Sequence, residues 1–217
     1  MGWFFRTFYS TIGKKLIMSL TGLFLCSFLL VHLTGNFQLF KDDGGEAFNH
    51  YSEFMSTNIL IRILEIGLFL GFALHITEAL WLYFLNKKAR PVTYAKNQAS
   101  ENSTLTSRTM IWSGSIVLVF LVVHLKSFFI DHRIIGSELT MYQGVVQTFQ
   151  EPLYSWFYVL AMVLLGFHLN HGFQSAFQTL GLNHKKYTPL IKTVGLLFSV
   201  LIPLGYATMP LYFLFTK

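Results

Sequence analysis

The chain has 217 residues, of which 53% are hydrophobic and 12% are charged, and its formal net charge is +6. Soluble domains carry about 25% charged residues, so this composition excludes an ordinary water-soluble globular protein. The single cysteine, Cys26, excludes an internal disulfide, a thiolate metal cage and a complete ligand set for an iron–sulfur cluster. The composition therefore predicts an integral membrane protein.

Five apolar runs follow one another along the chain, each near the roughly 20 residues that cross a bilayer. We expect transmembrane helices at about 16–40, 58–85, 108–130, 152–180 and 190–214. The first run follows basic residues, as the core of a signal sequence does, but it is too long and no small-residue cleavage site follows it. We therefore expect it to remain, and we predict an all-α bundle of five transmembrane helices in one membrane domain, 1–217.

Basic residues gather in three segments: the N-terminal segment, the 86–108 connection and the 181–192 connection. These segments hold Arg6, Lys14, Lys15, Lys87, Lys88, Arg90, Lys96, Arg108, Lys185, Lys186 and Lys192. The opposite side collects Asp42, Asp43, Glu46, Glu53, Asp131, Glu138 and Glu151. Because cytoplasmic loops carry the excess of Lys and Arg, we expect the N-terminus in the cytoplasm and the C-terminus outside. The net positive charge is then an orientation signal, and no nucleic-acid partner is needed to explain it.

Four of the eight histidines lie one on each of the first four predicted helices: His32, His75, His124 and His168. The first two are 43 residues apart and the last two 44, and the tripeptide Val-His-Leu occurs at both His32 and His124. The first two helices and the next two thus form hairpins with the same histidine pattern. An unpaired imidazole is costly inside a membrane, so these residues are functional candidates.

Each of these histidines lies late in its helix. Because consecutive helices run in opposite directions, His32 and His124 are expected near the outer face, and His75 and His168 near the inner face. Two facing imidazoles are an axial ligand set for a low-spin haem, so the pattern predicts two haems b. Hydrogen bonding between helices is the plain alternative. A pair of zinc sites is disfavoured, since zinc normally takes three or four protein ligands.

His171 is an alternative ligand on the fourth helix, because it lies three residues beyond His168 on a similar face. It breaks the spacing of the other histidines and stands among polar residues. The spacing therefore favours His168 as the ligand and assigns His171 to a haem propionate, a neighbouring helix or a docked subunit.

Three blocks carry a family resemblance. They are Ile12-Gly13-Lys14-Lys15 leading into Met18-Ser19-Leu20-Thr21-Gly22, then Asn86-Lys87-Lys88-Ala89-Arg90-Pro91, and then His168-Leu169-Asn170-His171-Gly172 followed by Ser175-Ala176 and Gln178-Thr179-Leu180-Gly181. The chain resembles the single-chain, five-helix, two-haem cytochrome b anchor of succinate:quinone oxidoreductases, the succinate dehydrogenases and fumarate reductases of respiratory complex II. The last block resembles the form found in Bacteroidetes-type enzymes.

The resemblance implies that the four axial ligands are His32, His75, His124 and His168. It also implies a multi-pass protein of the bacterial inner membrane, with a flavoprotein carrying covalent FAD and an iron–sulfur protein docked on its cytoplasmic face. This chain would then be the non-catalytic electron-transfer subunit of the enzyme. Electrons from succinate would pass through the haems to a quinone, for which menaquinone is expected, or in reverse during fumarate reduction.

For the quinone, we expect a site near the outer His32–His124 pair. Polar groups that could hold its carbonyls and carry protons gather there: Asn36, Gln38, Glu53, Arg62 and Glu65. A purely structural role for these residues is an equal alternative. A second possible location is the cytoplasmic edge, with Ser19, Glu78, Arg108 or His171.

Two other functions remain open from the residues alone. The cytochrome b anchor of a hydrogenase or formate dehydrogenase also uses bundled helices with haem-ligating histidines. A haem-free transporter would also be compatible with a repeated hairpin.

Overall fold

The computed structural model describes residues 2, 10–89 and 108–216, and within these residues the regular structure is helical. The elements are α2 (Thr11–Asn36), η1 (Phe37–Phe40), α3 (Glu46–Thr57), α4 (Ile59–Lys88), α7 (Met110–His124), η2 (Leu125–Ile135), α8 (Met141–Gln150), α9 (Pro152–Thr179) and α10 (Thr188–Thr216). Five spans are long and apolar enough to cross a membrane: Thr11–Phe40, Ile59–Lys88, Met110–Ile135, Pro152–Thr179 and Thr188–Thr216. The prediction of five transmembrane helices is confirmed.

The first span starts earlier than expected, because the Ser10 side chain caps α2 by accepting from the Gly13 amide at 3.0 Å. The third span runs further than expected and changes its winding after His124, where the π-helix η2 continues to Ile135. π-Helical turns are uncommon and occur often at functional sites. Three of the basic residues used to predict orientation, Arg6, Arg90 and Lys96, lie outside the described residues.

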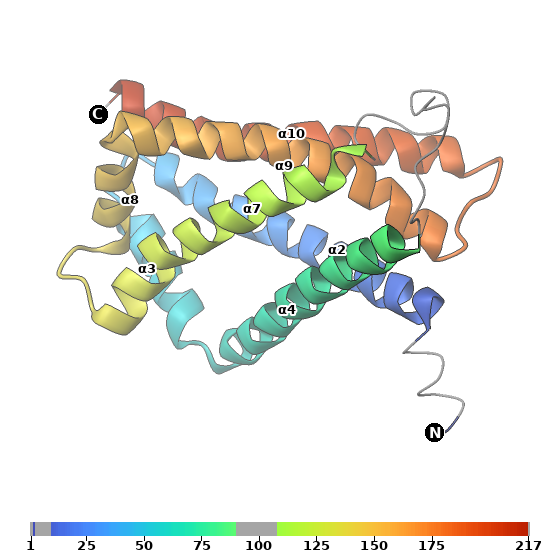
Figure 1. Cartoon of the computed structure of the whole chain (residues 1–217). Helices are drawn as coiled ribbons and strands as arrows, with labels where there is room; N and C mark the ends of the chain where they lie inside the picture. Colours follow the sequence, from blue (N-terminus) through green and yellow to red (C-terminus); the bar gives the residue numbers. More distant parts are fainter. Residues whose placement is uncertain (1, 3–9, 90–107, 217) are drawn as a thin grey trace.

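Two short helices, α3 and α8, were not predicted. Gly45 precedes α3 with a φ of +92°, where a non-glycine residue would be strained, and a side chain there would overlap the Tyr142 ring. A reciprocal capping box between Thr140 and Gln143 begins α8. The Asn49 side chain then accepts from the Tyr142 amide at 2.9 Å and joins the two helices. Figure 1 shows α3 and α8 together at one end of the bundle, called here the α3–α8 end.

The largest buried core lies at the α3–α8 end. It consists of Leu33, Leu39, Phe48, Tyr142, Val145, Phe149, Tyr158, Ile202, Met209 and Phe213. Helix α9 packs against α10, α7 and α2, and Figure 1 shows it alongside α10. Helix α4 packs mainly on α2, and Gly71 and Leu82 are its buried residues. Most of its large apolar side chains face outward, as expected of a helix in contact with lipid.

The described chain contains the same unit twice, a long helix, a short helix and a second long helix. The first copy is α2–α3–α4, and the second is α7–η2–α8–α9. Equivalent residues of the first long helix are 92 positions apart: Met18 and Met110, Gly22 and Gly114, Phe28 and Phe120, and His32 and His124. The repeat extends the two-hairpin pattern of the histidines to the groups around them.

Candidate functional site

Helices α2 and α7 bring His32 and His124 together. The two ring centroids are 5.8 Å apart and the ring planes are perpendicular, at 90°. Each ring stacks on the phenylalanine one turn earlier in its own helix, Phe28 at 5.1 Å and Phe120 at 5.6 Å. The two copies of the repeat therefore position their first histidine in the same way.

Helices α4 and α9 bring His75 and His168 together, with centroids 6.4 Å apart and planes at 75°. The structure thus brings together the pairs that depth along the helices predicts. His171 lies less than one turn further along α9 and is partly buried. In the same stretch of the helix, the Gln174 side-chain amide donates to Asn170 Oδ1 at 2.7 Å. The ring that faces His75 is that of His168.

The spacing of both pairs fits a metal held between two imidazoles. With metal–nitrogen bonds of about 2 Å and about 1 Å from each nitrogen to its ring centroid, two such rings have centroids about 6 Å apart. The separations of 5.8 and 6.4 Å lie on either side of this value. In the described part of the chain, no three His, Cys, Asp or Glu residues gather as a metal-binding group. Each facing pair offers two imidazoles, the number of protein ligands that a haem with two axial histidines requires.

The surroundings of the two pairs differ. Aromatic rings enclose His32 and His124, with Tyr206 at 5.9 Å from His32, and Phe128 at 5.3 Å and Tyr158 at 6.2 Å from His124. The second pair instead meets the backbone of the neighbouring helices.

His75 Nδ1 lies 3.2 Å from the Met18 carbonyl oxygen and 3.3 Å from Thr21 Oγ1. His168 Nδ1 is buried and has no hydrogen-bond partner among the described residues. A buried polar atom without a partner is rare and calls for an explanation.

The quinone-site candidates fall into two groups. Arg62 and Glu65 form an ion pair of 2.6 Å in the first turns of α4. Asn36 ends α2, and Gln38 in η1 lines an open groove of about 340 Å³ together with Lys41, Ala47, His50, Tyr51 and Phe54. The groove contains neither Arg62 nor Glu65. Glu53 lies exposed on α3.

Arg133 is a residue that the sequence analysis missed at this site. Its Nη1 donates to Glu65 Oε2 at 2.8 Å, and its Nη2 donates to the Ser56 carbonyl at 3.2 Å. Glu65 thus has two arginine partners from two different spans. The sequence signal was a basic residue near the end of the third apolar run, but its partner is 68 positions away.

The alternative candidates lie at the other end of α2 and α4. Lys14 Nζ is 3.4 Å from Glu78 Oε2, and these side chains are only 10% and 14% exposed. Lys14 also lies 4.5 Å from the Trp81 ring centroid. Ser19 is buried and donates to the Lys15 carbonyl at 2.8 Å. Arg108, which precedes α7, is exposed.

With this geometry in place, comparison with known proteins identifies the chain's relatives. Residues 86–203, more than half of the chain, match the family model for the succinate dehydrogenase/fumarate reductase transmembrane subunit. The chain belongs to this family. It is therefore a membrane anchor subunit of the succinate dehydrogenase/fumarate reductase type, with five transmembrane helices. Searches of curated proteins and of solved structures gave no match.

The matched residues of this transmembrane subunit include α7, α8, α9 and most of α10, and so include His124 and His168. His32 and His75 lie before the matched region, in the first copy of the repeat. Each histidine pair therefore contains one residue from the matched region and one from the first copy of the repeat, outside that region.

Proposed function

We propose that this subunit is a cytochrome b that holds two haems b and passes electrons between an iron–sulfur subunit and a membrane quinone. The observation that carries the proposal is the pair of facing imidazoles found twice in one bundle, at 5.8 and 6.4 Å. His32 and His124 would hold one haem, and His75 and His168 the other. A haem held by two histidines supplies reversible one-electron transfer at its iron.

The protein's own contribution is to hold the ligand rings and to exclude water. Phe28 and Phe120 stack on the rings of the first pair and limit their rotation. The core at the α3–α8 end adjoins that pair, because Phe120 and Phe128 contact the His124 ring and also pack against the core. The Met18 carbonyl orients His75. His171, one turn from His168, is available for a propionate or for a docked subunit.

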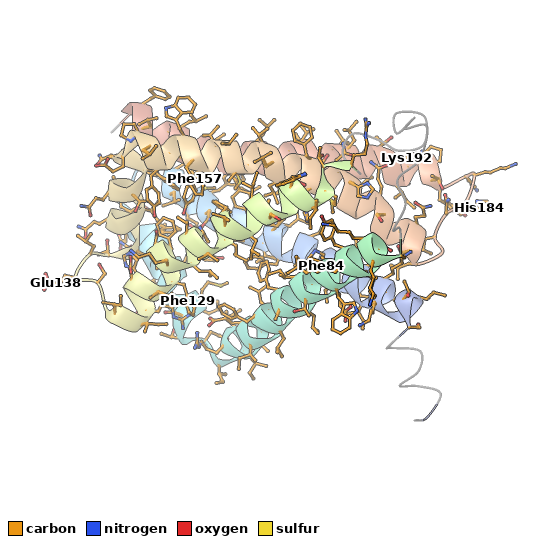
Figure 2. All side chains as sticks on the ribbon, in the orientation of Figure 1. Phe84, Phe129, Glu138, Phe157, His184 and Lys192 are labelled. Atoms are coloured by element: carbon orange, nitrogen blue, oxygen red, sulfur yellow. The ribbon has the colours of Figure 1, made fainter. Side chains whose placement is uncertain are left out.

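We infer the orientation from charge. The basic residues Lys14, Lys15, Lys87, Lys88, Arg108, Lys185, Lys186 and Lys192 gather at the end opposite α3 and α8. Figure 2 shows His184 and Lys192 at that end and Glu138 at the α3–α8 end. By the positive-inside rule the basic end faces the cytoplasm of a bacterial inner membrane, with the C-terminus outside. The His75–His168 pair would then be the inner pair.

Partners follow from the family and from this orientation. A flavoprotein subunit with FAD and an iron–sulfur subunit would dock on the basic end, since no residue pattern in this chain can oxidise a soluble substrate. Electrons would enter through the His75–His168 haem and leave through the His32–His124 haem. The quinone, for which we propose menaquinone, would bind near the outer pair, with Glu65 and Arg62 as its polar partners. Asn36 and Gln38 form a second, separate group of candidates at the same end.

The test is a reduced-minus-oxidised visible spectrum of the purified complex, with a haem assay per polypeptide. We expect b-type bands and two haems per chain. Removal of one histidine of a pair should leave one haem, and replacement of one histidine in each pair should leave none. A protein without haem bands, in a complex that assembles, would contradict the proposal. Identification of the co-purified subunits separates this function from a hydrogenase or formate dehydrogenase anchor.

A further inference from the structure

Two glycines occupy equivalent places in the repeat, and each lies against the ring of a histidine on another helix. A Cβ on Gly22 would lie 3.2 Å from His75 Cε1, and a Cβ on Gly114 would lie 3.3 Å from His168 Cε1. Both distances are tighter than ordinary contacts. Glycine therefore lets each ring lie directly on the backbone of the neighbouring helix.

On α2, this close approach exposes a backbone acceptor. Gly22 is four residues after Met18, so its amide uses one lone pair of the Met18 carbonyl in the helix. Because Gly22 has no side chain to shield it, the second lone pair can be reached by His75 Nδ1 at 3.2 Å and also by the Thr21 hydroxyl at 3.1 Å. A carbonyl only accepts, so Nδ1 carries the proton and Nε2 keeps the lone pair that binds a metal.

On α7, the equivalent carbonyl has a different partner. Ser113 is 3% exposed, and its hydroxyl donates to the Met110 carbonyl at 3.1 Å. The Gly114 amide uses the other lone pair of that carbonyl. His168 Nδ1 approaches Gly114 much as His75 Nδ1 approaches Gly22, at 3.4 Å and 3.6 Å from the position of an added Cβ. It is left without a hydrogen-bond partner among the described residues.

In the first copy the equivalent hydroxyl is divided between two carbonyl acceptors. Its equivalent of Ser113 is Thr21, whose hydroxyl has a closer acceptor in the Ile17 carbonyl at 2.8 Å than in the Met18 carbonyl at 3.1 Å. Thr21 Oγ1 can then itself accept from His75 Nδ1 at 3.3 Å. The two copies thus place a hydroxyl at the same position but leave the histidines with unequal hydrogen bonding.

We propose that three positioning residues, Ser113, Met18 and Gly22, make His75 and His168 ligands of unequal basicity. The inference rests on the proposed haem function. His75, which donates to a carbonyl, is the more basic ligand, and His168 is the weaker one because Ser113 occupies its acceptor. A more basic ligand stabilises ferric over ferrous iron, so these groups set the reduction potential of the haem held by this pair.

The test is a redox titration of the whole purified complex, followed by haem absorbance, on the variant Ser113→Ala. Loss of the hydroxyl frees the Met110 carbonyl for His168 Nδ1. We expect the midpoint of one haem to fall, by on the order of tenfold in the ferric/ferrous equilibrium or about 59 mV for one electron. The second haem should be unchanged, and the low-spin ferric EPR signal of only one haem should shift.

The variant Gly22→Ala changes the other ligand, His75. The midpoint of the same haem should rise, because the added methyl group displaces His75 from the Met18 carbonyl. Gly67→Ala on α4 is the matched control, since a Cβ there meets nothing within 4 Å. Unchanged midpoints and EPR signals in Ser113→Ala, with both haems bound, would overturn the inference. If Ser113→Ala does not assemble, the same result in Gly22→Ala would overturn it. Absence of haem from the unmodified complex would instead refute the proposed function.

Discussion

Arg133 on the π-helix η2 donates to Glu65 on α4, with 2.8 Å between Nη1 and Oε2, and Arg62 holds the same carboxylate at 2.6 Å. Two arginines and one carboxylate leave a net positive charge where the α4 and η2 segments meet. Charged groups in a membrane protein usually pair and mark functional sites. The triad joins Arg62 and Glu65, two of the residues proposed for the quinone site, to Arg133.

Glu65→Gln should retain both haems and lower quinone reductase activity by roughly a hundredfold, because an amide cannot accept and pass on the protons that quinone reduction consumes. The measurement is quinone reduction by the complex, with haem per chain as the control for assembly. Glu138→Gln, which changes an exposed carboxylate in the connection between η2 and α8, is the matched control. Normal turnover in Glu65→Gln would place the quinone elsewhere, and the Ser19, Glu78, Arg108 and His171 region would then be examined in the same way.

His168→Ala should remove or perturb one haem, because loss of an axial nitrogen leaves the iron with one protein ligand in an apolar pocket. The same result is expected for His32, His75 and His124. His171→Ala should keep both haems with a smaller spectral change, because the ring facing His75 is that of His168. A haem assay on purified protein measures both. Loss of a haem in His171→Ala, with both retained in His168→Ala, would reverse the ligand assignment.

Lys14→Met should destabilise the protein strongly, because it leaves Glu78 without its lysine partner in a site where both side chains are at most 14% exposed. Breaking a buried ion pair by removing one partner costs on the order of 3–5 kcal/mol. The double variant Lys14→Met with Glu78→Gln should cost less than Lys14→Met alone, because no unpaired charge remains. Thermal unfolding in detergent compares the variants. Equal losses in the single and double variants would show that the ion pair itself contributes little.

Gly45→Ala should destabilise the α3–α8 end, because Gly45 has a φ of +92° and a side chain would overlap Tyr142. The backbone term alone is about 1–2 kcal/mol. Gly44→Ala is the matched control, since Gly44 also has a positive φ, of +66°, but open space for a Cβ. The difference between their melting temperatures in detergent isolates the Tyr142 contact. Equal melting temperatures would mean that the ring moves away without cost.

Sequence alone was sufficient for the five spans and for the grouping of His32 with His124 and of His75 with His168. Hydropathy over about 20 residues is a local property, and the antiparallel order of successive spans converts position along a helix into depth. Hydropathy did not predict the short helices α3 and α8, which have 12 and 10 residues. Their starts are defined by the caps at Gly45 and Thr140.

Tertiary structure alone decided which groups surround the histidines and the charged residues. Glu65 pairs with Arg133, which is 68 positions away in the sequence, and Lys14 pairs with Glu78, which is 64 positions away. The Met18 carbonyl reaches His75 only because Gly22 faces that ring. Such contacts depend on how helices rotate and approach each other in the bundle, and this is determined by packing between distant segments rather than by the residues of any one helix.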